Sequence, residues 1–104
     1  MPLPTNLLTG SVGFGGMNKP PDVLLVQRLL NAAPFVKGGP NPALVPDGMC
    51  GPKTCGAISR FQSVNLGFSD GRIDVGGMTI AALLSLLEAL GLLAQLLGTP
   101  GGGP

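Results

Sequence analysis

Glycine and proline divide this chain of 104 residues into three segments that can form regular structure. The chain contains 18 Gly and 11 Pro, and 23 of these 29 residues lie in 1–22, 34–52 and 98–104. Segments rich in both residues disfavour helices, because Gly raises the entropy cost of ordering the backbone and Pro removes an amide donor. The length suits one modest core. We therefore expect a small all-α domain in which three helices are joined by long Gly/Pro-rich loops.

The first two expected helices carry apolar residues at helical spacing. One begins after Pro20 and Pro21, since Pro suits the first helical position, and it ends at residues 31–34. The second spans about Thr54 to Val64. The side chains expected on the solvent faces of these helices are those of Gln27, Arg28, Arg60 and Gln62.

The third expected helix spans Met78 to Leu97, with nine Leu and no Pro. One small domain offers too little surface to cover so many Leu residues, so the part after Leu84 is expected to dock on a partner or on another copy. A membrane span is disfavoured because Glu88 would lie near its centre and no basic flank follows. The residues expected to dock are Leu90, Leu93 and Leu97.

The segments outside these helices are expected to be irregular. Residues 1–19 form an N-terminal arm, since 11–18 has too many Gly residues for a helix or a regular strand. The connection 34–52 is too rich in Gly and Pro for regular structure, and Leu44 and Val45 are expected to anchor it to the core. Residues 69–77 form a tight loop or a very short strand. The domain itself then spans 20–97, and 98–104 is a Gly/Pro tail.

Composition excludes several functions. The chain has no His, so the usual neutral-pH general base and the commonest metal ligand are missing, and we expect neither an enzyme nor a metal or cofactor site. The net charge is +1 and the six Lys and Arg residues are scattered, which argues against nucleic acid as a partner. The absence of Trp and Tyr argues against aromatic platforms for sugars or bases.

The two cysteines, Cys50 and Cys55, are too few for a zinc site or a disulfide framework. Their separation of five residues allows a local disulfide, and free thiols are the alternative. The N-terminal residues show no pattern of a secretory signal peptide.

Two pieces of the sequence repeat one theme. Asp47-Gly-Met-Cys-Gly-Pro-Lys-Thr54 precedes the second helix, and Asp70-Gly-Arg-Ile-Asp-Val-Gly-Gly-Met-Thr79 precedes the third. Asp-Gly favours a tight turn, and the later Thr suits a helix start. Together with the Val-Gln and Phe-Gln pairs of the first two helices, this order of motifs over residues 20–84 resembles the peptidoglycan-binding-like domain family. The loop 32–46 is longer than that family's pattern. At the position of Cys50 the family commonly has a large apolar residue that points inward, so the resemblance implies that Cys50 is buried.

This resemblance implies a compact three-helix, non-catalytic module that binds peptidoglycan, and hence an extracytoplasmic or virion-associated location. A structural subunit of a phage virion, tail or secretion apparatus, assembled as a homo-oligomer or with other proteins, is the alternative function. The Asp-Gly loops are interpreted mainly as structural turns, with a ligand surface as the other interpretation. Arg side chains suit the carboxylates of a peptide stem, and a solvated face is the alternative. The candidate ligand-binding residues are Arg28, Arg60, Gln62, Asp70 and Arg72.

Overall fold

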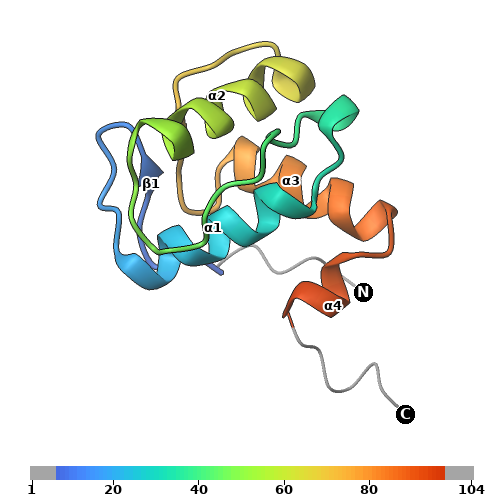
Figure 1. Ribbon diagram of the computed structural model, residues 1–104, viewed down its shortest axis with the longest axis horizontal. Coiled ribbons are helices and arrows are strands. Elements are labelled where there is room, and N and C mark those ends of the chain that lie inside the picture. Colours follow the sequence, from blue (N-terminus) through green and yellow to red (C-terminus); the bar gives the residue numbers. More distant parts are fainter. Residues whose placement is uncertain (1–6, 98–104) are drawn as a thin grey trace.

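Helices dominate the computed structural model, which describes residues 7–97 (Figure 1). The N-terminal residues 1–6 of the expected arm and the tail 98–104 lie outside the described residues. In chain order the elements are β1 (Val12–Gly13), α1 (Pro20–Ala32), the 3₁₀ helix η1 (Phe35–Lys37), α2 (Pro52–Leu66), β2 (Arg72–Ile73), α3 (Met78–Ala89) and α4 (Leu93–Leu97). The mostly helical class expected from the sequence is therefore confirmed.

The core lies where α1, α2 and α3 meet, and each of these helices contacts the other two. Pro occupies the start of α1 and of α2, where its missing amide leaves no helical hydrogen bond unmade. Phe61 of α2 is the largest fully buried side chain. The apolar side chains around it that are also buried are Val23, Val26, Leu29, Leu30, Ile58, Ile73, Ile80, Leu83, Leu84 and Leu87.

A two-stranded antiparallel sheet makes a strictly all-α description only approximate. Val12 of β1 pairs with Ile73 of β2, and Gly13 pairs with Arg72. Gly13 has φ of 118°, and a Cβ at this position would overlap the carbonyl oxygen of Gly71. Glycine thus favours the pairing here because it permits a close approach of two backbones, whereas its abundance in 11–18 led us to expect no strand there. The very short strand that was one expectation for 69–77 is present as β2.

The N-terminal arm is tied to the domain by polar contacts as well as by β1. Asn18 adopts a left-handed conformation, and its side-chain amide bonds both backbone polar groups of Gly13. Thr9 donates its backbone N–H and its hydroxyl to the buried carboxylate of Asp22 at the start of α1. Leu8 is buried in the core. The described part of the arm therefore packs as part of the domain.

The long loop between α1 and α2 contains one short regular element, η1, which the Gly/Pro content led us not to expect. Asn31 holds this loop through two bonds to the backbone of Leu44, at 2.7 and 2.8 Å. Leu44 is buried as expected, but Val45 is 71% exposed and anchors nothing.

The prediction of a single third helix over 78–97 is wrong, because α3 ends at Ala89 and a separate helix, α4, begins at Leu93. Gly91 has φ of 73°, its amide bonds the carbonyl of Glu88, and the Leu92 amide bonds that of Leu87. This bond pattern is a Schellman motif, which ends a helix by satisfying its last carbonyl groups.

The break redirects the side chains that were expected to dock on a partner. Leu93 is only 4% exposed and packs in the chain's own core, so its expected docking role is corrected. Leu90 is 43% exposed. The side chain of Leu97 lies outside the described residues.

Candidate functional site

A buried glutamine on α1 organises the first Asp-Gly loop. The Gln27 side-chain amide donates hydrogen bonds of 3.1 Å each to Asp47 Oδ1, the Met49 carbonyl and Thr54 Oγ1. Its Oε1 accepts the Gly48 amide at 2.9 Å. We call this set of residues the first Gln clamp, and it joins α1, the loop and the first turn of α2.

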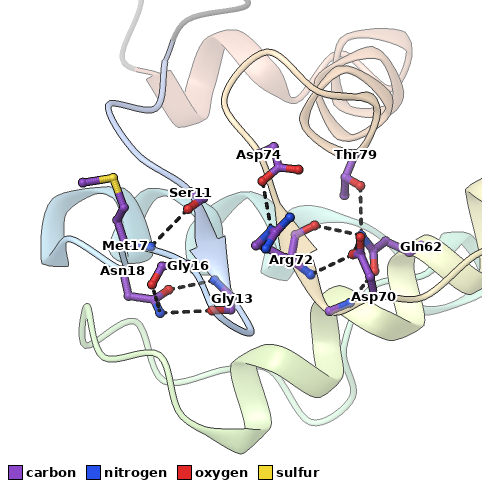
Figure 2. A network of polar contacts seen from close by, with 11 residues as sticks. Ser11, Gly13, Gly16, Met17, Asn18, Gln62, Asp70, Arg72, Asp74 and Thr79 are labelled. Carbon is purple, nitrogen blue, oxygen red and sulfur yellow. Dashed lines mark hydrogen bonds and ion pairs between the residues drawn. The ribbon is translucent and has the colours of Figure 1, made fainter.

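A buried glutamine on α2 organises the second Asp-Gly loop in the same way (Figure 2). The Gln62 side-chain amide donates to Asp70 Oδ1 at 2.8 Å, the Arg72 carbonyl at 2.9 Å and Thr79 Oγ1 at 3.0 Å. Its Oε1 accepts the Gly71 amide at 2.9 Å. This set is the second Gln clamp, and it joins α2, β2 and α3.

The expectation that Gln27 and Gln62 face solvent is therefore wrong. Each lies on the apolar face of its helix, where helical spacing suggests an apolar residue, and each side-chain amide is fully bonded. Buried polar groups must be hydrogen-bonded, and the Asp-Gly loops supply the partners. Gln62 was expected to bind a ligand, but its side chain is buried and its amide is bonded to other residues of the domain.

The two loop carboxylates act as structural acceptors. Asp47 accepts the Met49 amide and Gln27, and these bonds lower its pKa from 3.8. Asp70 accepts Gln62 and the Arg72 amide, and these bonds lower its pKa likewise. Hydrogen bonds to the charged form favour ionisation. The geometry therefore favours the structural interpretation of both Asp-Gly loops.

The backbone of Arg72 belongs to the second Gln clamp, and the residue also lines a small cavity beside it. Its Nε is 3.0 Å from Asp74 Oδ1, and both side chains are largely exposed. The cavity measures about 170 Å³ and includes Asp70, Phe68 and Met78 in its lining. An exposed ion pair of this kind contributes little to stability, and the space is small for a ligand.

A larger groove of about 790 Å³ lies between the long loop and the first half of α2. Its lining is mostly apolar and consists of Gln27, Pro40, Asn41, Pro42, Ala43, Leu44, Val45, Asp47, Met49, Gly51, Pro52, Lys53, Thr54, Gly56, Ala57 and Arg60. This volume is in the range of small-molecule and cofactor sites. Within the described range 7–97, no aromatic side chain lines this groove.

Three charged residues lie at the groove. Lys53 and Asp47 are exposed, and Arg60 is half-buried. The Arg60 guanidinium lies 3.9 Å from the centre of the Phe35 ring and donates to the Gly39 carbonyl at 3.3 Å. Stacking and a backbone acceptor hold this guanidinium in one place, which suits it to bind a carboxylate.

The structure brings three of the five candidate ligand residues, Gln62, Asp70 and Arg72, together in the second Gln clamp and places the other two elsewhere. Arg60 lines the groove, Asp70 and Arg72 line the small cavity, Gln62 is buried, and Arg28 is exposed on α1 away from both linings. The sequence reasoning missed the groove residues outside this set. The signal that pointed to them was the unusual length of the Gly/Pro-rich connection 34–52, which we interpreted as an irregular loop anchored to the core by Leu44 and Val45.

The two cysteines lie together at the entry to α2, next to the first Gln clamp, and neither of them lines the groove. Their Sγ atoms are 3.7 Å apart, and both residues are half-buried free thiols. The expectation that Cys50 is buried is thus met only in part, and the disulfide is not formed in this state. Burial, together with the hydrogen bond to Cys55, raises the pKa of the Cys50 thiol to about 11.

Over residues 7–97 no cluster of three or more His, Cys, Asp and Glu side chains is placed to hold a metal ion. Among the helices of the same residues, none is both long enough and apolar enough to cross a membrane.

Comparisons with known proteins give no relative for this arrangement, since no family model, no curated protein and no solved structure matches the chain. The fold and the groove define a small, mostly helical domain with two Gln clamps, the first of which borders a mostly apolar groove.

Proposed function

We propose that this protein is a non-catalytic peptidoglycan-binding module and that the groove holds a stem peptide of the cell wall. The observation that carries the proposal is the groove itself, an apolar channel bordered by Lys53, Arg60 and Asp47. A stem peptide presents small apolar side chains, free carboxylates and, in many walls, an amino group. The charges at the groove complement these groups.

Each border charge has a separate partner in this proposal. Arg60 and Lys53 bind peptide carboxylates through charge-assisted hydrogen bonds. Asp47 is ionised at neutral pH, because the bonds that lower its pKa favour the charged form, and it accepts a hydrogen bond from the peptide's amino group. Ala57 and the loop prolines contact the methyl groups. The glycan is held only loosely, since in the described part of the chain no aromatic side chain lines the groove for a sugar ring to stack on.

The resemblance of the sequence motifs to peptidoglycan-binding-like domains supports the same function. The residues that carry this resemblance, Asp47, Thr54, Asp70 and Thr79, are those that the two Gln clamps hold. Within the described residues Asp47 is the sole carboxylate that lines the groove, so the acid–base pair of a glycoside hydrolase is missing there. The proposed activity is therefore binding without cleavage, at an extracytoplasmic or virion-associated location.

The test is retention of the protein on insoluble peptidoglycan sacculi at low salt, with soluble stem peptide and soluble glycan oligomers as competitors. Stem peptide is expected to release the protein and glycan is not. Retention should fall as salt rises, because exposed ionic contacts are screened. Absence of retention, or release by glycan alone, overturns the assignment of the groove.

Three variants locate the site. Gly56→Leu fills the groove from α2, where a Cβ meets no atom within 4 Å, and should weaken retention at least about tenfold. Lys53→Ala removes one exposed charge and should weaken retention about threefold. Arg28→Ala is the matched control, because this exposed cation lies outside the groove lining, and retention should be unchanged.

A second candidate function, a structural subunit of a larger assembly, is favoured by a different observation. Large apolar side chains are exposed on several elements, including Phe14 at 74% and Val36 at 79%. Exposed apolar area of this kind is common at protein interfaces. Sedimentation velocity over a range of concentrations tests it, since a subunit that self-associates gives a mass that rises above the monomer. A monomer at all concentrations that is retained on sacculi favours the binding module alone.

A further inference from the structure

The cysteine pair is placed across the entry to α2. Cys50 follows the Met49 carbonyl that the Gln27 amide bonds, and Cys55 lies in the first turn of the helix. The Cys55 amide bonds the Gly51 carbonyl at 3.1 Å and closes that turn. The four residues between the two cysteines, 51–54, all line the groove. A covalent link between the two sulfurs would therefore fix this wall of the groove.

The geometry permits such a link with little movement. The Sγ atoms are 3.7 Å apart, and a disulfide needs about 2.0 Å, so rotation about the two Cα–Cβ bonds has to bring the sulfurs closer by roughly 1.7 Å. Both residues are partly exposed, so a small reagent reaches them. Met49 and Lys53 beside them are exposed as well.

We propose that Cys50 and Cys55 form a reversible redox modification site, a dithiol that small-molecule disulfides such as oxidised glutathione convert to an intramolecular disulfide that stiffens the groove wall. This proposal does not depend on what the groove binds.

The reaction proceeds by two thiol–disulfide exchanges. The Cys55 thiolate attacks one sulfur of the glutathione disulfide, a Cys55–glutathione bond forms, and the first glutathione leaves as a thiolate. The Cys50 thiolate then attacks the Cys55 sulfur, the Cys50–Cys55 bond forms, and the second glutathione leaves. The two cysteine protons end on the two glutathione thiols, so the protein loses two electrons and glutathione disulfide gains them.

The order of attack follows from the surroundings of Cys50. Its pKa is raised to about 11, chiefly by burial, so little of its thiolate is present at pH 7. Cys55 is therefore the first nucleophile and Cys50 the resolving one. Decay of the mixed disulfide should accelerate about tenfold per pH unit between pH 7 and 9.

The experiment equilibrates the full chain with oxidised and reduced glutathione at several ratios and counts alkylatable thiols by intact mass. Both thiols are expected to disappear together as oxidised glutathione increases, with no glutathione adduct left at equilibrium. The Cys50→Ser variant should stop as a stable adduct on Cys55. In the wild-type chain, persistent free thiols, a stable mixed disulfide or a disulfide-linked dimer each overturns the proposal.

The effect on the groove wall has its own measurement. Amide hydrogen exchange at Cys55 should slow at least about threefold in the oxidised chain, and the melting temperature should rise by about 4–8 °C, because the crosslink restricts the opened state. The Cys50→Ser/Cys55→Ser chain under the same oxidant is the control and should show neither change. Unchanged exchange in a fully oxidised wild-type chain would refute the stiffening while leaving the modification site intact.

Discussion

The two Gln clamps have the same hydrogen bonds but different surroundings. In each, a buried Gln amide donates to an Asp carboxylate, a backbone carbonyl and a Thr hydroxyl, and its oxygen accepts a Gly amide. In the first clamp Gln27 and Asp47 are 20 residues apart, and in the second Gln62 and Asp70 are 8 residues apart. Within residues 7–97, a groove of about 790 Å³ borders the longer connection, and a cavity of about 170 Å³ borders the shorter one. A clamp of fixed geometry thus tolerates connections of very different length, and the connection determines whether a groove forms beside it.

The largest effect is expected from removing the glutamines themselves. Gln27→Ala and Gln62→Ala each leave a Gly amide and a Thr hydroxyl without their partner and open a cavity, so each should lower the free energy of unfolding by about 3 kcal/mol. Urea unfolding measures both, with exposed Arg28→Ala as the near-neutral control. If Gln27→Ala lowered the free energy of unfolding far less than Gln62→Ala, water would be replacing the hydrogen bonds of the Gln27 amide. The two clamps would then not be equivalent.

The next largest effect concerns the glycines that turn each Asp-Gly loop. Gly48 has φ of 76° and Gly71 has φ of 73°, and a Cβ at either position lies 3.1 Å from an oxygen atom. Gly48→Ala and Gly71→Ala should each cost about 1–2 kcal/mol, because L residues are strained in the left-handed region. Thermal unfolding followed by circular dichroism checks this. Equal costs at the two sites support equivalent turns, whereas a cost at one site alone breaks the comparison.

A smaller change, a gain in stability, is expected at a position where the helix after the first clamp has Gly and the helix after the second has Ala. Gly56 lies two residues after Thr54 in α2, and Ala81 lies two residues after Thr79 in α3. Gly56→Ala gives α2 the residue of α3 and should raise the free energy of unfolding by about 0.5–1 kcal/mol, since Ala is the better helix former and its Cβ meets open space. Urea unfolding measures the gain. A loss of stability would mean that the groove side of α2 has no room for a side chain at position 56.

The smallest loss of stability is expected when the pH is lowered. The pKa values of Asp47 and Asp70 are lowered from 3.8 in the folded chain, by the Met49 amide and by Gln62 respectively. A carboxyl group whose pKa is lower in the folded than in the unfolded chain stabilises the fold at pH values above its unfolded pKa. This contribution to the free energy of unfolding is lost as the pH falls through about 4 and below. Both carboxylates are exposed, so the loss should be gradual. Unfolding measured from pH 7 to 2 should show it, and Asp47→Asn/Asp70→Asn should flatten the acid limb.

Local sequence signals determined much of this fold. Pro20, Pro21 and the apolar spacing after them indicated α1 nearly at its observed bounds. Apolar spacing indicated α2 over about Thr54 to Val64, and the structure extends this helix to Pro52–Leu66. The repeated Asp-Gly and Thr residues indicated two turns that lead into helices, and the structure has both. These signals are readable because capping, turn conformation and helical periodicity involve residues that are neighbours in the chain.

Tertiary structure alone decided the rest. Gln27 and Gln62 have the helical position of apolar residues, and hydrogen-bond partners that lie 8 to 27 residues away in the chain, in loops and in the following helix, make their burial favourable. Leu93 turned from an expected docking residue into a core residue because Gly91 ends α3, and the preceding Leu run gave no sign that this Gly would act as a stop. The groove likewise depends on where Asn31 holds the long loop against α1. The burial of the two glutamines and the formation of the groove rest on contacts between segments distant in sequence, whose free energies no local pattern encodes.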